Sequence, residues 1–366
     1  MQSNSLYRKF RPFQLDDVVG QVYTIQTLKE ASKSDKFSHA YMFSGNFGCG
    51  KTSTARIVAN LMNCTDVKDG VLCGKCRACK TIPKEASMDV VELAAATHTG
   101  VEHVRALIDS SQWSPVELKY KVFIIDECQG LSKAANEALL KILEEPPSYI
   151  KLILTTTEPE KLVPTILSRC QRYKFNRIPT KLIAKRLKFI ADAENIKSSD
   201  GALFALAKLS RGSMRDGIKY LEQIGIIAAG KTIKEDHVHK LFGTIDRMAI
   251  MNIIKAIIAR DIPLLVDYIN DFSMAAADTS QIMLEVTEVL RNIQILVASE
   301  KRGAKLVDLP ESEIEELIKI SKSVSLDQLI GMSSLFSDIK RDMAVNINSQ
   351  WIMEATLINC CKSLEK

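Results

Sequence analysis

Three glycines, a lysine and a threonine lie close together at residues 45–52, which read Gly-Asn-Phe-Gly-Cys-Gly-Lys-Thr. This is G-x-x-x-x-G-K-[ST], the pattern of a phosphate-binding P-loop. Glycines let backbone amides curl around phosphate groups, Lys51 can reach the outer phosphates, and the Thr52 hydroxyl can bind Mg²⁺. The pattern therefore predicts a nucleotide site. Its residues are Gly45, Asn46, Phe47, Gly48, Cys49, Gly50, Lys51, Thr52 and Ser53.

Two carboxylates, Asp126 and Glu127, follow the apolar run at residues 121–125. Asp126 could hold Mg²⁺ through water or together with Thr52, and Glu127 could orient and polarise an attacking water. The alternative is a core strand that ends in a solvated acidic turn. The combination of an acidic pair with a P-loop favours a nucleotide hydrolase.

Four cysteines, Cys64, Cys73, Cys76 and Cys79, have the short spacing of a thiolate metal site. Four thiolates can close a tetrahedral site, which favours zinc and leaves no open position for catalysis. An iron–sulfur cluster and unmetallated cysteines remain as alternatives. The sequence has nine cysteines, and we expect a cytoplasmic chain without disulfides, because it shows no signal peptide and no membrane-spanning run.

The elements around these motifs indicate an α/β fold followed by an all-α region. Strands are expected at residues 40–44, 88–93, 121–127 and 151–157, with helices between them. This alternation predicts a doubly wound parallel sheet whose ligand lies at the carboxyl ends of the strands. From residue 179 onward the pattern is helical. The net charge of +5 is compatible with a polyanionic partner but does not identify one.

Further candidates lie outside these motifs, each with an alternative. The basic and aromatic segment at residues 6–21 could cover an adenine base or pack on its own domain; its candidates are Tyr7, Arg11, Pro12, Val18 and Val19. Residues 97–100, Thr-His-Thr-Gly, could meet a phosphate or cap a helix. Arg169 could pair locally or reach a neighbouring molecule's triphosphate. Arg215, in the first turn of a helix, argues for an anion or an acidic partner nearby.

The residues from 245 onward carry no catalytic motif and read as an assembly module of long helices. Its apolar residues are expected in the core. These are Met251, Met274, Met283, Met332, Met343 and Met353, together with Trp351, Cys360 and Cys361.

These motifs resemble one family, the ATPase subunit (gamma/tau) of the bacterial DNA polymerase III clamp loader, in the AAA+ superfamily. The resemblance is close over residues 6–225, and the rest of the chain resembles the family only in its layout. It implies an AAA+ ATPase domain at residues 1–178 with a zinc module at 64–79, a helical lid at 179–243 and a helical collar at 244–366. The most specific pieces are residues 7–12, 17–21, 39–41, 138–147 and 168–170, with the four-cysteine insertion.

By that resemblance, Arg169 is a finger that acts on an adjacent subunit's ATP. Thr157 falls at the sensor-1 position, and Arg215 falls at sensor 2, where it would contact the gamma-phosphate. The implied cofactors are ATP, Mg²⁺ and Zn²⁺. The implied partners are delta-like and delta-prime-like subunits, further copies in a pentameric ring, a sliding clamp and primer–template DNA. ATP binding would open and grip the clamp, and DNA would trigger hydrolysis and release. We expect a location at the nucleoid.

The chain departs from the family pattern at two places. After the acidic pair the family commonly has Val-His-Met, where this chain has Cys128-Gln129-Gly130. Residues 94–100 lack one acidic and two basic residues of the family, which predicts weaker DNA affinity with a smaller salt slope. The family's longer form has further domains that bind helicase and polymerase, so this chain is a short form or part of a longer one. The alternatives are another AAA+ DNA remodelling ATPase and a non-catalytic scaffold subunit.

Overall fold

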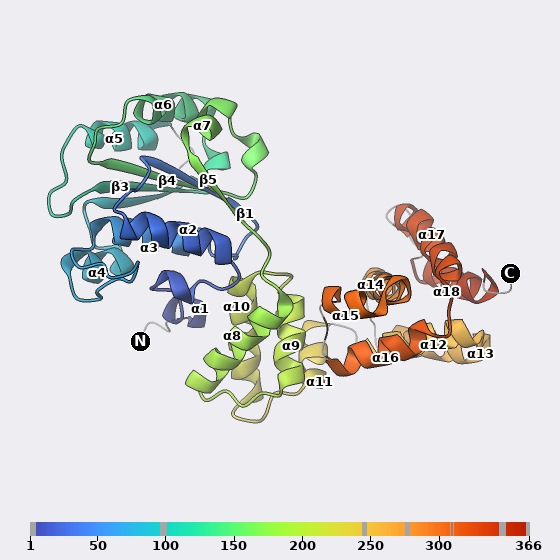
Figure 1. The fold of residues 1–366 in the computed structure, drawn as a ribbon. Coiled ribbons are helices and arrows are strands. Elements are labelled where there is room, and N and C mark those ends of the chain that lie inside the picture. The colour runs from blue at the N-terminus through green and yellow to red at the C-terminus, as the bar shows by residue number, and fades with distance from the viewer. Residues whose placement is uncertain are drawn as a thin grey trace. The chain divides into compact units, whose positions relative to one another are not determined.

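The computed structural model describes residues 5–95, 101–243, 247–274, 279–307, 309, 311–343 and 349–363. The chain divides into two compact units, which are described separately (Figure 1). The first comprises residues 1–195 and 206–226, and the second comprises residues 196–205 and 227–366. None of the helices in the described ranges combines the length and the apolarity needed to cross a bilayer.

A five-stranded parallel sheet is the centre of the first unit. Its strands are β1 (Ala40–Gly45), β2 (Val90–Ala94), β3 (Lys121–Asp126), β4 (Ile150–Thr156) and β5 (Gln171–Phe175), in the order β2-β3-β4-β1-β5. The strand order reverses at β1, which lies between β4 and β5. A switch of this kind places a ligand crevice outside the carboxyl ends of the strands.

Helices cover both faces of the sheet (Figure 1). Successive side chains of β1 point to opposite faces of the sheet, and Ala40 to Phe43 are all buried, so both faces need a cover. Tyr41 and Phe43 pack in one core with α2 (Val22–Lys33) and α3 (Lys51–Asn63). Ala40 and Met42 point to the other face and pack with α5 (Val101–Ser111), α6 (Lys133–Glu144) and α7 (Pro164–Arg169). Since both faces are buried, β1, β3 and β4 are apolar almost throughout.

The expected strands and the helices between them are confirmed, and β5 is an addition. Residues 171–175 are not among the expected strands, but they form an edge strand that pairs with β1. The remaining helices of this unit are α1 (Leu6–Lys9), α4 (Arg77–Thr81), α8 (Thr180–Ala193) and α10 (Met214–Ala228). The chain passes between the units after residue 195, within α9 (Asp200–Leu209) and near the end of α10, after residue 226.

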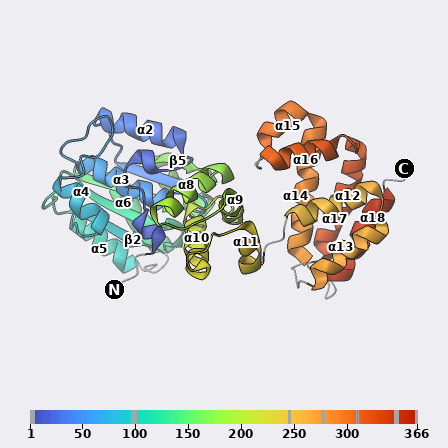
Figure 2. The same ribbon diagram turned by 90° about the horizontal axis from the view of Figure 1, so that it is seen from below.

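The second unit is helical, as expected, and has its own core (Figure 2). Its further helices are α11 (Glu235–Phe242), α12 (Arg247–Ala259), α13 (Ile262–Met274), α14 (Thr279–Ala298), α15 (Glu300–Leu306), α16 (Glu311–Ser321), α17 (Leu326–Met343) and α18 (Ser349–Ser363). The buried residues include Met251, Met283, Met332, Met353, Cys360 and Cys361. The side chains of Met274 and Met343 lie outside the described residues.

The expectation that Trp351 is buried is wrong, because its side chain is 66% exposed. Trp351 precedes the buried Met353 by two residues on α18, and two residues correspond to a rotation of about 200° around a helix. The two side chains therefore leave the helix on opposite faces.

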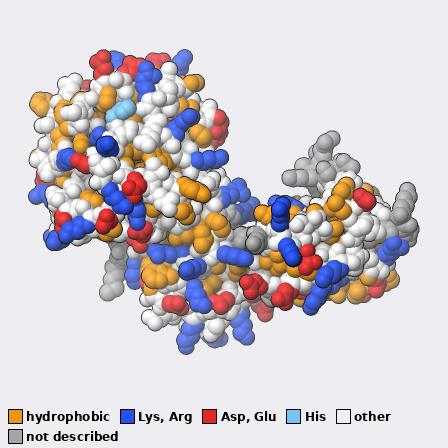
Figure 3. All heavy atoms as spheres, viewed as in Figure 1, with side chains coloured by type: hydrophobic (Ala, Val, Ile, Leu, Met, Phe, Trp, Pro, Cys, Tyr) orange, Lys and Arg blue, Asp and Glu red, His pale blue; other side chains and the backbone are white. Residues whose placement is uncertain are grey.

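Charged side chains are mixed on the surface rather than sorted by sign. On the face shown in Figure 3, basic and acidic groups alternate over short distances on each unit. The net charge of +5 is therefore not gathered into one basic surface on that face.

Candidate nucleotide-binding site

The P-loop joins β1 to α3, which begins at Lys51. Gly48 has a φ of +67° and Gly50 has a φ of +104°, in the region that favours glycine. A Cβ atom at Gly48 would overlap the Ser213 hydroxyl at the start of α10. The glycines therefore allow both the curl of the loop and the close approach of α10.

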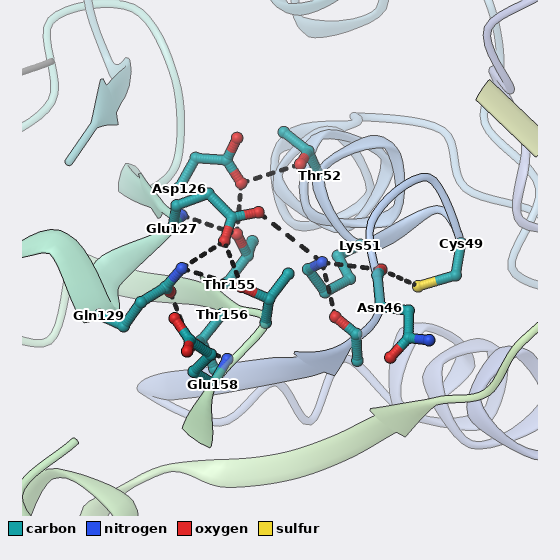
Figure 4. A network of polar contacts seen from close by, with 12 residues as sticks. Asn46, Cys49, Lys51, Thr52, Asp126, Glu127, Gln129, Thr155, Thr156 and Glu158 are labelled. Carbon is teal, nitrogen blue, oxygen red and sulfur yellow. Dashed lines mark hydrogen bonds and ion pairs between the residues drawn. The ribbon is translucent and has the colours of Figure 1, made fainter. Parts of the chain in front are cut away.

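The Lys51 ammonium lies under the loop and is almost fully buried, with 4% of its side chain exposed. Nζ donates hydrogen bonds to the carbonyl oxygens of Gly45, at 2.8 Å, and Asn46, at 3.0 Å (Figure 4). It also lies 3.8 Å from Oε1 of Glu127. A buried ammonium needs such partners, and a phosphate brought into the loop would provide stronger ones.

Asp126 ends β3, and its carboxylate faces Thr52 at the start of α3. The Thr52 hydroxyl donates to Oδ1 of Asp126 at 2.8 Å, and the Thr155 hydroxyl from β4 donates to the same oxygen. A hydroxyl and a carboxylate are oxygen ligands of the kind that Mg²⁺ prefers. The structure thus brings together both residues predicted to hold magnesium.

Glu127 follows Asp126 with a φ of +53°, which is rare for a residue other than glycine. Its backbone N–H donates to Thr155 Oγ1 at 3.2 Å. Thr157, just beyond the end of β4, donates to Oε2 of Glu127 at 3.1 Å. The predicted acidic residue and the predicted sensor residue are therefore in direct contact.

A cavity beside the P-loop gathers most of the predicted nucleotide contacts. Its predicted lining residues are Tyr7, Arg11, Pro12, Val18, Val19, Phe47, Gly48, Cys49, Gly50, Lys51, Thr52, Ser53, Asp126, Glu127 and Arg215. Gly45 and Asn46 shape the loop without lining this cavity, and Thr157 and Arg169 do not line it. Apolar residues of the N-terminal segment thus face the loop, as expected of a cover for a base.

Six lining residues were missed by the sequence analysis. They are Phe10, Asp17, Ile178, Arg186, Met214 and Ile218. Phe10 and Asp17 lie in the N-terminal segment already singled out, so its pattern could have included them. The other four come from around α8 and α10, and no local pattern shows that these helices pack against a loop more than a hundred residues earlier.

Two contacts attach α10 to the walls of the cavity, one to the P-loop and one to Tyr7 of α1. The Met214 N–H donates to the Gly48 carbonyl at 3.0 Å. The Arg215 guanidinium lies 5.1 Å from the centre of the Tyr7 ring, within the range of a cation–π contact. Arg11, on the same wall, has a pKa lowered by burial and by the nearby Arg56. The cavity is lined by four cationic side chains, which can meet a triphosphate, and by three carboxylates: Arg11, Lys51, Arg186 and Arg215, and Asp17, Asp126 and Glu127.

Arg169 ends α7 outside this cavity. It donates to Glu144 at 2.8 Å and to the Thr165 carbonyl at 3.0 Å. Local pairing, one of its two interpretations, is thus observed, and action on a neighbouring molecule stays a prediction. Residues 97–100 lie outside the described residues.

The four predicted cysteines converge at a second site near α4. Cys64 Sγ lies 3.8 Å from Cys76 Sγ and 3.7 Å from Cys79 Sγ, and Cys73 Sγ lies 3.9 Å from Cys79 Sγ. A tetrahedron with metal–sulfur bonds of about 2.3 Å has edges of about 3.8 Å. The four sulfurs all lie within 4.8 Å of one another. They therefore fit a single ion, whereas a multi-iron cluster needs its sulfurs farther apart.

The environment of this cluster lowers the thiol pKa at two of the four positions, Cys76 and Cys73. Burial acts to raise the pKa of Cys76, but hydrogen bonds from the backbone and from the other thiols lower it to about 6. Hydrogen bonds from the backbone of Lys75 and Cys76 lower the pKa of Cys73. Burial raises the pKa of Cys64 and Cys79.

Family comparisons cover nearly the whole chain. Residues 20–179 match "DNA polymerase III, delta subunit", residues 182–231 match "DNA polymerase III clamp loader subunit, ATPase lid domain", and residues 233–365 match "DNA polymerase III subunits gamma and tau domain III". The chain is similar to DNA polymerase III subunit tau of Bacillus subtilis, with 33% identity over 364 residues, 99% of this chain and 64% of the relative. It is also similar to subunit tau/gamma of Haemophilus influenzae, with 38% identity over 296 residues, 81% of this chain and 43% of the relative.

The chain thus spans roughly half the length of these relatives, between 43% and 64%. Among solved structures, a point variant of Thermotoga maritima RuvB has a TM-score of 0.50 and 20% identity, over 68% of this chain and 79% of that one. This similarity concerns the fold alone. The parallel sheet with its P-loop is an AAA+ fold, followed by a helical lid and a helical domain. The chain belongs to the gamma/tau family of DNA polymerase III clamp-loader subunits.

Proposed function

We propose that the chain is the ATP-hydrolysing motor subunit of a sliding-clamp loader. ATP binding would open and grip the clamp, and primer–template DNA would trigger hydrolysis and release of the clamp on DNA. The observation that carries this proposal is the convergence of Lys51, Thr52, Asp126 and Glu127 on one cavity, in a chain whose relatives are subunits of DNA polymerase III. A non-catalytic scaffold would not need this set.

Each residue at the cavity has a proposed role in the hydrolysis of ATP to ADP and phosphate. Lys51 binds the outer phosphates, and Thr52 and Asp126 hold Mg²⁺, which neutralises developing charge. Glu127 orients the attacking water and polarises it. The base packs against Tyr7, Pro12, Val18 and Val19. Arg215 contacts the gamma-phosphate as sensor 2, Thr157 acts as sensor 1 beside Glu127, and Arg169 acts on the ATP of an adjacent subunit.

We further propose that the four-cysteine site holds a structural zinc ion. The short distances between the sulfurs support this, and four thiolates leave no position for a reacting water. The zinc would fix residues 64–79 against the P-loop domain and would take no part in the chemistry.

The proposed setting is a pentameric complex with copies of this chain and with delta-like and delta-prime-like subunits, at the nucleoid. The ATPase domain would comprise residues 1–178, the lid 179–243 and the collar 244–366. In this arrangement the collar joins subunits, and the sliding clamp and DNA bind to the ATPase domains.

The experiment that tests this function is steady-state ATP hydrolysis. The rate is compared for the chain alone, with primed DNA, and with primed DNA, cognate clamp and partner subunits. Strong stimulation that needs both DNA and clamp supports a clamp loader. A rate that is indifferent to the clamp, or driven by single strands or junctions alone, indicates another AAA+ motor instead.

A further inference from the structure

Gln129 lies between three polar side chains at the ends of β3 and β4, those of Glu127, Thr156 and Thr157. It belongs to a single helical turn, Cys128–Gly130, that follows Glu127 directly. Its Nε2 donates to Glu127 Oε2 at 2.7 Å and to Thr157 Oγ1 at 2.9 Å. Its Oε1 accepts from Thr156 Oγ1 at 2.8 Å (Figure 4). One amide therefore joins Glu127, just after β3, to Thr156 at the end of β4 and to Thr157 just beyond it.

The orientation of this amide follows from its partners. An ionised carboxylate only accepts hydrogen bonds, so the NH₂ group of Gln129 must face Glu127. The opposite orientation would place two acceptors against each other at 2.7 Å. The Thr156 hydroxyl can donate to Oε1 and itself accepts the N–H of Glu158 at 3.0 Å.

These contacts account for both oxygens of the Glu127 carboxylate. Oε1 lies 3.8 Å from the Lys51 ammonium, and Oε2 accepts from Gln129 and Thr157. A terminal phosphate at the P-loop would compete for Lys51, because it is the more highly charged acceptor. It would not compete for Gln129 or Thr157, neither of which lines the nucleotide cavity. The hydrogen bonds to Oε2 are thus the ones that can hold Glu127 while ATP is bound, and Gln129 contacts both Glu127 and Thr157.

We propose that Gln129 is a positioning residue, which holds Glu127 through Oε2 so that Oε1 faces the attacking water. It also couples the direction of Glu127 to Thr157, the proposed sensor-1 residue. Gln129 acts through Glu127 and not on the nucleotide, since it lines a neighbouring hollow with Asn46, Phe47 and Thr157 instead. This inference rests on the proposed function and adds a residue that its motifs do not include.

The test is Gln129→Glu in the full chain, assembled with its partner subunits, clamp and primed DNA. This substitution keeps the size of the side chain and an acceptor for Thr156, but it removes both donors and adds a like charge beside Glu127. We expect kcat to fall by about 10²-fold, as when a reacting group is displaced by about 1 Å. The affinity for a fluorescent ATP analogue should stay unchanged.

The split between kcat and KM, together with a conservative variant, separates positioning from a merely structural role. Loss of an interaction that acts in the transition state lowers kcat and kcat/KM equally, so Gln129→Glu should lower both by the same factor and leave KM unchanged. Gln129→His keeps an N–H donor and should retain more activity than Gln129→Leu. Gln26→Glu, an identical change at an exposed position of α2, should leave both kcat and KM unchanged.

The outcomes distinguish this inference from the proposed function. If the unmodified complex hydrolyses ATP, and Gln129→Glu keeps the same kcat, the positioning role is wrong. An equal loss of kcat in Gln129→His and Gln129→Leu, with a lower unfolding temperature in both, would reduce Gln129 to a structural residue, which also overturns it. If the unmodified complex shows no hydrolysis with clamp and DNA, the proposed function fails and this inference falls with it.

Discussion

At the scale of single residues, the buried ammonium of Lys51 should decide whether a nucleotide binds. Its partners are two loop carbonyls and the more distant Glu127. A charged hydrogen bond contributes up to about 3 kcal/mol, which corresponds to about a hundredfold in affinity. We expect Lys51→Ala to weaken binding of a fluorescent ATP analogue by at least that factor. Lys36→Ala, at an exposed position, is the matched control. An unchanged affinity in Lys51→Ala would remove this residue from the site.

We expect a different effect from substitution of Arg169, because the ATP on which it is proposed to act is bound to another subunit. Its ion pair with Glu144 is at the surface and contributes at most about 1 kcal/mol to stability, so Arg169 can leave that partner. We expect Arg169→Ala to leave ATP binding and folding intact, while the assembled complex loses DNA-triggered turnover. Arg172→Ala, an exposed neighbour on β5, should keep full turnover. An equal loss of turnover in the isolated chain would contradict action across an interface.

At the scale of elements, the approach of α10 to the P-loop depends on Gly48. A methyl group there would overlap Ser213 Oγ, close to the hydrogen bond from Met214 N–H to Gly48. The positive φ of Gly48 adds a cost of about 1–2 kcal/mol for any L-residue. We expect Gly48→Ala to lower both the unfolding temperature and the affinity for ATP.

Gly230→Ala separates these two costs, because Gly230 has a φ of +85° and no atom near its missing Cβ. It should lower stability through backbone strain alone and should leave ATP affinity unchanged. If Gly48→Ala bound ATP as well as Gly230→Ala does, the contact between α10 and the loop would not matter for binding.

The four-cysteine module is a second element whose role can be isolated. Cys79 is buried in the same core as α2 and α3, and Arg77 forms a bidentate pair with Glu117. Loss of a bound ion would leave this corner of the core without its cross-link. Chelation should therefore lower the unfolding temperature, without a specific effect on kcat once Mg²⁺ is restored. A loss of activity at unchanged stability would contradict a structural role, and brown colour with visible absorbance would exclude zinc.

How far the sequence predicts these elements depends on how local their signals are. The P-loop and the strand before Asp126 were predictable, because glycine spacing and buried apolar runs are local. The edge strand β5 was missed, since in residues 171–175 only Tyr173 and Phe175 face the core and the rest are polar. Arg186 and Ile218 reach the cavity through tertiary packing, and Gln129 acts through contacts with another strand. No spacing rule reveals such residues.

At the scale of the whole molecule, the helical unit carries no part of the cavity, and its described residues form a separate core. A family model for gamma and tau domain III covers residues 233–365 of it. Its contribution to the proposed function must therefore come from its surface. Apolar residues that are exposed on this unit are candidates for contacts with other subunits.

Trp351 is the largest such residue, and it gives the clearest test of assembly through the helical unit. Exposed tryptophans are enriched among the residues that contribute most to interfaces, where truncation costs about 2 kcal/mol or more. We expect Trp351→Ala to weaken association with copies of the chain and with partner subunits about 30-fold. The unfolding temperature of the single chain should not change, because the side chain is 66% exposed. Met353→Ala, on the opposite face of α18, should do the reverse and destabilise the helical unit by about 2–5 kcal/mol. Sedimentation and thermal unfolding measure the two effects, and normal assembly of Trp351→Ala would place the interface elsewhere.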